Sequence, residues 1–129
     1  MKKPLPRSLH LLGAALLLAG CCPVASAAER KISLLLWNTQ TRYEQCKGGV
    51  IEELRRQGFK ESELVIVVEE ADGNKTTVAE LAKRFSAAHM NVIVPIGTSA
   101  AVAVAAEIKE VPVVFAMVFD PVDSKIALE

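Results

Sequence analysis

The chain has 129 residues, enough for a single domain, and its 15 Lys and Arg residues balance 15 Asp and Glu residues for a formal net charge of zero. Charges of both signs are scattered along the chain, so no basic patch indicates a nucleic-acid surface. The histidines are His10 and His89, and the cysteines are Cys21, Cys22 and Cys46. Most of these lie near the N-terminus, so the sequence predicts neither a metal site nor a disulfide framework.

The first 27 residues have the features of a secretory signal peptide. A positively charged start precedes an apolar stretch at 9–20 that is too short to cross a bilayer comfortably, and residues 25–27 (ASA) form a small-residue cleavage pattern. Residues 18–21 (LAGC) also fit the lipobox of bacterial lipoproteins, in which the cysteine becomes the lipidated N-terminus. We therefore expect export, with either a lipid anchor on Cys21 or plain cleavage into the periplasm. A membrane anchor or a buried helix is the alternative interpretation.

After the signal peptide, short apolar runs alternate with stretches of helical periodicity. The runs are continuous rather than alternating, which is typical of strands buried on both faces of a parallel sheet. The predicted strands cover 31–37, 64–68, 92–96 and 113–118. The predicted helices cover 41–57, a stretch capped by Thr76 or Thr77 with Glu80 completing a capping box, and 99–108.

This alternation of strands and helices predicts an α/β fold for residues 28–129, with a Rossmann-like parallel sheet that has helices on both faces. Cys46 falls on the apolar face of the first predicted helix, and we interpret it as a small buried hydrophobic residue rather than a reactive thiol.

In such sheets, ligands bind beyond the carboxyl ends of the strands. The residues expected there are Trp37, Asn38 and Thr39, then 69–73, then Gly97, Thr98, Ser99 and Ala100, and finally Phe119 and Asp120. The start of the third helix offers free backbone N–H groups and two hydroxyls, which suit a ligand carboxylate. The alternative is an ordinary helix start that binds nothing, with Thr98 or Ser99 as its cap. Trp37 is either a core residue or a wall for an apolar side chain.

The catalytic motifs that this edge could carry are incomplete. Gly97, Ser99 and Ala101 approach the G-x-S-x-G pattern of hydrolases, but no histidine follows Ser99 to act as its base. The chain has neither a G-x-G-x-x-G fingerprint nor a P-loop, so no cofactor is predicted. Asp120 lacks the cluster of acids that a phosphate-accepting carboxylate needs. We therefore predict binding without catalysis, and a hydrolase fragment with Ser99 as nucleophile is the alternative.

The chain resembles a known family over residues 31–123. The features that carry the resemblance are the Gly-Thr-Ser-Ala-Ala turn at 97–101, the strand entry KEVPVVF at 109–115 and the Asp-Pro-Val sequence at 120–122. On these residues the chain looks like the ABC transporter substrate-binding proteins of the tryptophan/tyrosine uptake type. The resemblance implies a type I periplasmic-binding fold, whose two α/β lobes close on the ligand, and residues 28–129 correspond to the N-terminal lobe alone.

The resemblance also implies a function and a set of contacts. The ligand would be an amino acid, often aromatic or hydrophobic, and the partner would be an ABC permease. Thr98, Ser99 and Ala100 would contact the carboxylate of the ligand. Asn38 and Thr39 would line the cleft, and Asp120 would lie near the ammonium group of the ligand or at the hinge. Because the resemblance implies one lobe of two, we expect the chain alone to bind its ligand weakly. An exported sensor lobe of the same fold, without a permease, is a further alternative.

Overall fold

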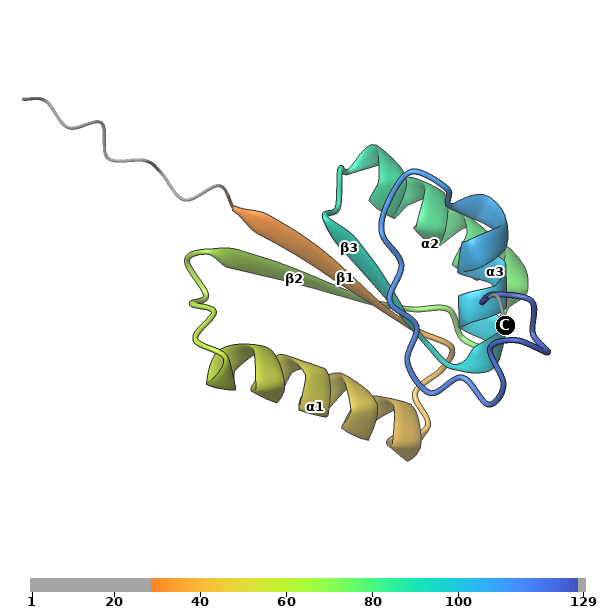
Figure 1. Cartoon of the computed structure of the whole chain (residues 1–129), viewed down its shortest axis with the longest axis horizontal. Helices are drawn as coiled ribbons and strands as arrows, with labels where there is room; N and C mark the ends of the chain where they lie inside the picture. Colours follow the sequence, from red (N-terminus) through yellow and green to blue (C-terminus); the bar gives the residue numbers. More distant parts are fainter. Residues whose placement is uncertain (1–28, 128–129) are drawn as a thin grey trace, which may run out of the picture.

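The computed structural model describes residues 29–127, so Cys21 and the predicted signal peptide lie outside the described part of the chain. Its elements are β1 (Arg30–Leu36), α1 (Thr41–Arg56), β2 (Leu64–Glu70), α2 (Lys75–Ala87), β3 (Val92–Ile96) and α3 (Thr98–Glu107). The three strands form a parallel sheet in the order β2-β1-β3. Helix α1 covers one face of this sheet, and α2 and α3 cover the other (Figure 1). The predicted α/β class, with a parallel sheet between helices, is confirmed.

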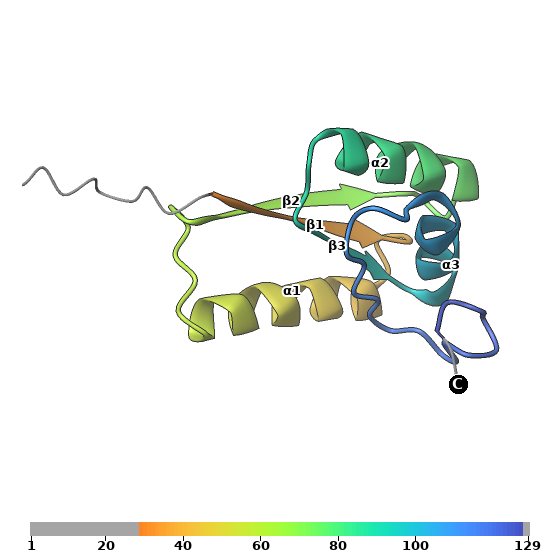
Figure 2. The ribbon, with the colours of Figure 1, turned by 45° about the horizontal axis from the view of Figure 1, so that its top comes forward.

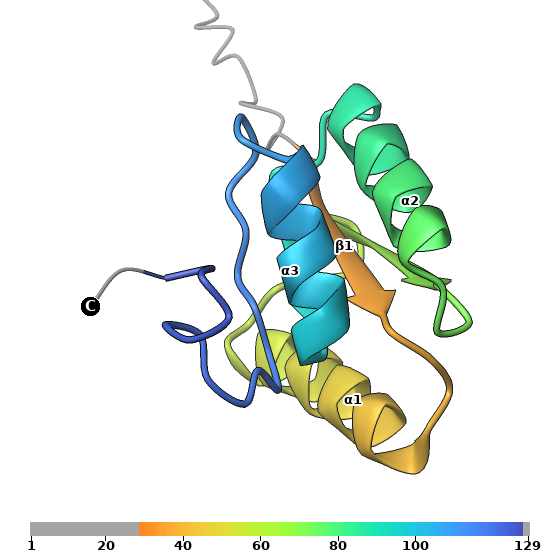
Figure 3. The same cartoon turned by 90° about the vertical axis from the view of Figure 1, so that its right-hand side faces the viewer.

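Two apolar clusters hold these layers together, one on each face of the sheet. Alternate residues of β1 serve the two clusters, because successive side chains of a strand point to opposite faces. Leu34 and Leu36 pack under α1 with Tyr43, whereas Leu35 packs under α2 and α3 with Phe85. Figure 2 shows the sheet between its two helical layers, and Figure 3 shows α2 and α3 side by side. The continuous apolar run of the central strand therefore reflects burial on both faces.

The predicted fourth strand is wrong in its extent. Residues 113–118 run beside β3 but form only two isolated bridges with it, Ile93 to Val113 and Ile96 to Ala116. The backbone N–H groups of Ile93 and Gly97 donate across this edge, to Pro112 and Ala116 respectively, at 3.0 and 2.9 Å. Pro95 lies between them and has no N–H to donate, so the ladder is interrupted at its centre.

The start of α2 also differs from its prediction. Its N-cap is Asn74, whose Oδ1 accepts hydrogen bonds from the backbone N–H groups of Thr76 at 2.8 Å and Thr77 at 3.4 Å. A capping box of Thr77 and Glu80 is therefore wrong. Asn side chains are among the strongest N-caps, and here the cap follows a tight turn at Asp72 and Gly73, both with positive φ.

Candidate functional site

The chain divides at the carboxyl end of the sheet, between β1 and β3. After β1 the chain enters α1 on one face, and after β3 it enters α3 on the opposite face (Figure 2). Adjacent parallel strands whose connections leave in opposite directions create a crevice at their carboxyl ends, and this crevice is the usual ligand site of open α/β sheets. The topology alone therefore marks the ends of β1 and β3, at Trp37 and Gly97.

A cavity of about 460 Å³ lies at this point. Three elements supply its walls: the end of β1 with the first turn of α1, the first turn of α3, and the segment after the edge bridges. Its lining residues are Trp37, Arg42, Tyr43, Thr98, Ser99, Met117, Val118 and Phe119. We call this the strand-end cavity. It brings residues from three separate parts of the sequence to the one place where the fold expects a ligand.

Gly97 makes the close packing behind this cavity possible. A Cβ atom at this position would lie 3.1 Å from Cε1 of Tyr43 and 3.3 Å from Cβ of Trp37, and the residue has a φ of 109°. Both the space and the backbone conformation therefore require glycine. Tyr43 is nearly buried, at 7% exposed, and Trp37 packs against both apolar clusters. Because Gly97 has no side chain, Tyr43 and Trp37 can pack closely against the start of α3.

Helix α3 begins at this cavity without a side-chain cap. Its N-cap is Gly97, and neither Thr98 nor Ser99 caps the helix, so the alternative in which one of these residues caps α3 is wrong. The first N–H groups of a helix have no partner within the helix, and they carry the positive end of its dipole. Both hydroxyl residues are partly exposed and line the cavity. The arrangement can donate several hydrogen bonds to an anionic group.

Thr98 has a second role that the sequence did not predict. Its Oγ1 accepts a hydrogen bond from the backbone N–H of Phe119 at 3.1 Å. This bond fixes the third wall of the cavity against α3. Met117, at the base of the same wall, has a φ of 55°, a strained conformation for a residue other than glycine. Phe119 itself is 97% exposed beside the cavity.

Arg42 and Tyr43 form a fixed pair on the opposite wall. The guanidinium carbon of Arg42 lies 4.7 Å from the centre of the Tyr43 ring, and its Nη2 donates to the Tyr43 hydroxyl oxygen at 3.0 Å. The pairing places a cation at the cavity and retains other N–H donors. Sequence reasoning missed four lining residues: Arg42, Tyr43, Met117 and Val118. A position in the first turn of the helix after β1 was the available signal for Arg42.

The other residues expected from the sequence are outside the lining: residues 69–73 lie at and after the end of β2, and the rest lie close to lining residues in sequence. Gly97 and Ala100 are buried beneath the cavity. Asn38 accepts a hydrogen bond from the backbone N–H of Gln40 at 3.1 Å, and Thr39 is exposed in the same loop. The carboxylate of Asp120 accepts from the backbone N–H groups of Val122 and Asp123 at 3.1 and 2.9 Å, so it is engaged in a local turn.

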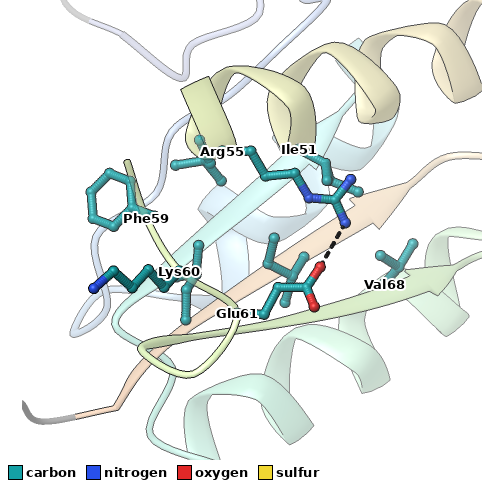
Figure 4. A pocket seen from close by; sticks show the side chains of 9 residues that line it. Ile51, Arg55, Phe59, Lys60, Glu61 and Val68 are labelled. Carbon is teal, nitrogen blue, oxygen red and sulfur yellow. Dashed lines mark hydrogen bonds and ion pairs between the residues drawn. The ribbon is translucent and has the colours of Figure 1, made fainter. Parts of the chain in front are cut away.

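A second hollow lies at the outer edge of the sheet, between α1 and β2 (Figure 4). It has a volume of about 240 Å³, and we call it the β2-edge groove. Figure 4 shows that Arg55 and Glu61 face each other across it, and their side chains form an ion pair of 3.1 Å. Its lining is otherwise mostly apolar: Ile51, Leu54, Phe59, Leu64, Ile66 and Val68, with Lys60. The groove does not touch the carboxyl ends of β1 and β3.

The chemistry available at Ser99 is limited by its distance from histidine. His89 is the one histidine within residues 29–127, and it precedes β3, whereas Ser99 follows β3. A five-residue strand separates these positions by roughly 16 Å at the usual rise per residue. Within the same residues, no three His, Cys, Asp or Glu side chains gather to hold a metal ion. None of the helices in the described part is long and apolar enough to cross a membrane.

Comparison with known proteins assigns the chain to a family. Residues 37–128 match the family described as ABC transporter substrate binding protein, and the chain belongs to that family. The family consists of binding proteins rather than enzymes. The predicted resemblance to ABC substrate-binding proteins is thus confirmed at the level of the family.

Solved structures share the fold of this chain. The chain resembles an ABC domain from Streptococcus pneumoniae in complex with L-Trp, with a TM-score of 0.76 and 24% identity over 79% of this chain and 35% of that one. It also resembles a conserved domain protein from Vibrio cholerae, with a TM-score of 0.75 and 25% identity over 78% of this chain and 34% of that one.

A third similar structure is the ligand-free, open form of a substrate-binding protein with adhesive properties from Clostridium difficile. Its TM-score is 0.73, and its identity is 24% over 78% of this chain and 34% of that one. The chain therefore spans about one third of the length of the solved structures that it matches. A comparison with curated proteins gives no significant match.

Proposed function

We propose that this chain is the N-terminal lobe of the solute-binding component of an ABC importer, and that it binds an amino acid in the strand-end cavity. The ligand carboxylate would lie against the start of α3, at Thr98, Ser99 and the N–H groups around Ala100. An aromatic or hydrophobic ligand side chain would lie against Trp37 and Phe119. Asn38, Thr39 and Asp120 stay in this proposal as residues at the rim.

The observation that carries the proposal is the composition of the strand-end cavity. Uncapped helix N–H groups, two hydroxyls and a guanidinium lie together at the switch point of the sheet, beside aromatic rings. A carboxylate matches the donors, and an apolar side chain matches the rings. The structure from Streptococcus pneumoniae holds L-Trp, which supports an aromatic amino acid as the first ligand to test.

The proposed location of the protein is outside the cytoplasmic membrane. Its support is the sequence of residues 1–27, with a lipid on Cys21 or cleavage after Ala27 as the two forms. The mass of the native protein, measured separately in membrane and soluble fractions, distinguishes them. A chain starting at Cys21 with added lipid mass supports the anchored form, and a chain starting at Ala28 supports the free one. A native chain that retains residues 1–27 would contradict both.

A binding titration tests the proposed ligand class directly. Trp37 is the only tryptophan in the chain and lines the cavity, so its fluorescence reports L-phenylalanine or L-leucine binding without a competing signal. Calorimetry extends the test to L-tryptophan. Because the proposed site is completed by a second lobe, and residues 29–127 supply one lobe, we expect a dissociation constant on the order of 1 mM. Micromolar binding would contradict the need for a second lobe, and no response to any of the three would contradict the proposal.

Substitutions at two threonines test whether the binding signal arises at the strand-end cavity. Thr98→Val keeps the size of the side chain but removes the hydroxyl that accepts from Phe119, and it should weaken binding about fivefold to tenfold. Thr76→Val is the matched control, because Thr76 is exposed at the start of α2. Equal effects of the two substitutions would argue against the site.

A sensor of the same fold remains the second candidate for the whole protein. Its proposed binding site is identical, so ligand titration does not separate it from an importer component. The test is whether genes for a permease and an ATPase adjoin the gene for this chain. Their presence would favour import, and a signalling gene in their place would favour sensing.

A further inference from the structure

The lining of the strand-end cavity has a single charged side chain, and it is a cation. Among the eight described residues that line the cavity, Arg42 is the only one with a charged side chain. The acidic residues closest in sequence to its walls are engaged elsewhere. Glu44 forms an ion pair with Lys47, and the carboxylate of Asp120 accepts two backbone N–H groups of its own turn. The lining therefore offers no carboxylate to a ligand ammonium group.

The polar groups of the cavity are also biased toward donation. Oγ1 of Thr98 already accepts from the N–H of Phe119, while its own O–H remains available to donate. Tyr43 accepts from Arg42, and its O–H is similarly left as a donor. Arg42 keeps further N–H groups in a plane that is held over the Tyr43 ring. A ligand atom in contact with the N–H groups of Arg42 or of the helix start must be an acceptor, and an anionic acceptor is favoured.

Building on the proposed function, we infer that the strand-end cavity selects the carboxylate and the apolar side chain of a ligand and does not recognise its α-amino group. The ligand class is then the aromatic and hydrophobic carboxylates as a whole, with amino acids as one subset. Arg42 is the specificity-determining residue of the cavity. A des-amino analogue carries a net negative charge, whereas the amino acid is a zwitterion, so Arg42 attracts the analogue more strongly.

Three ligands of one ring and different charges test this inference on the full chain. The probes are L-phenylalanine, 3-phenylpropionate and 2-phenylethylamine, and ligand-observed NMR titration measures weak binding of each. We expect 3-phenylpropionate to bind about threefold to tenfold more tightly than L-phenylalanine, and 2-phenylethylamine at least about tenfold more weakly than either.

Substitutions of two arginines assign the preference to its residue. Arg42→Gln should weaken binding of 3-phenylpropionate about tenfold and remove its advantage over L-phenylalanine. Arg55→Gln is the matched control, because Arg55 lines the β2-edge groove and should leave all three affinities unchanged. Circular dichroism of both variants checks that the fold is retained, which is expected because both side chains are exposed.

The outcomes separate this inference from the proposed function. If L-phenylalanine binds and 3-phenylpropionate does not, the cavity recognises the amino group. The inference is then overturned while the proposed function stands. If Arg42→Gln and Arg55→Gln change the affinities equally, Arg42 is not the selective residue. If none of the three ligands binds, the proposed function fails and the inference fails with it.

Discussion

The strand-end cavity and the β2-edge groove are two hollows of the same domain with opposite chemistry. In the groove, the cation of Arg55 faces the carboxylate of Glu61, and the remaining surface is mostly apolar. In the cavity, the cation of Arg42 has no acidic neighbour in the lining, and the start of α3 and two hydroxyl residues line the same cavity. The groove thus supplies a carboxylate to its arginine, whereas the lining of the cavity supplies none.

The comparison shows that shape alone does not identify a ligand site in this fold. Both hollows are open, and both have aromatic or aliphatic walls. Only the cavity combines the crevice at the ends of β1 and β3, a cation without a carboxylate in the lining and a strained backbone at Met117. The Arg55–Glu61 pair is exposed on both sides, so it adds little to stability.

The largest expected effect is on the free energy of unfolding, from a substitution at Gly97 behind the cavity. Gly97→Ala places a Cβ 3.1 Å from the Tyr43 ring in a backbone conformation that alanine rarely adopts, and should cost about 2–4 kcal/mol of unfolding free energy. Urea denaturation measures the loss. Gly49→Ala in α1 is the matched control, because nothing lies within 4 Å of the added atom, and it should stabilise the fold by about 0.5–1 kcal/mol. A neutral Gly97→Ala would mean that the rings are not packed as described.

A smaller effect is expected at Ser33, in the centre of the sheet. Its hydroxyl is buried and has no hydrogen-bond partner, but it lines neither hollow. Ser33→Ala should therefore raise the unfolding free energy by up to about 1 kcal/mol without changing ligand affinity. Thermal unfolding and the ligand titration measure the two quantities, and exposed Ser62→Ala is the control. Weaker ligand binding by Ser33→Ala would show that an unsatisfied polar group acts on the cavity from a distance.

The groove itself should tolerate change. Val68 is 42% exposed on the open edge of β2, and Val68→Thr removes apolar surface from the groove with nearly the same shape. We expect a change in unfolding free energy within about 0.5 kcal/mol and no change in affinity for L-phenylalanine. If this substitution weakens ligand binding more than Arg42→Gln does, the two hollows have been assigned the wrong way round.

The smallest change concerns Cys46, which lies along α1 between Tyr43 of the cavity and Ile51 of the groove. The side chain packs against the apolar cluster under α1, and this burial raises the pKa of the Cys46 thiol. Because the thiolate is the reactive form, Cys46 should react with iodoacetamide more slowly in the native protein than in urea at neutral pH. Peptide mapping by mass spectrometry follows this cysteine alone. Equal rates would contradict the packing of α1 on the sheet.

Much of the fold could be predicted from the sequence because its strands are continuous apolar runs, of which β1 and β3 are largely buried and β2 is partly buried. Continuous apolar runs marked β1, β2 and β3, and helical spacing marked the helices between them. The fourth strand could not be excluded in this way, since 113–118 is as apolar as the others. What limits it is the missing N–H of Pro95 in the neighbouring strand, and pairing between strands is invisible in the pattern of either one.

The site was predictable where it follows from topology and not where it depends on side-chain partners. Trp37, Thr98 and Ser99 line the cavity because they follow strands that end side by side. Arg42 belongs to it because its guanidinium lies over Tyr43, a contact between neighbouring residues that no spacing rule indicates. Asp120 lies outside the lining, since its carboxylate hydrogen-bonds to the turn that follows it. Whether Asp120 contributes to binding stays a prediction.

Pro95 also affects the local stability of the segment that leads to the third wall of the cavity, at residues 117–119. The N–H groups of Val114 and Ala116 donate to the carbonyls of Ile93 and Pro95, but Pro95 has no N–H to donate to Val114, so this edge is held by two separate bridges rather than by a continuous ladder. Such an edge opens in small, independent steps. Its amide hydrogens should therefore exchange with solvent well before those of β1, which is paired on both sides.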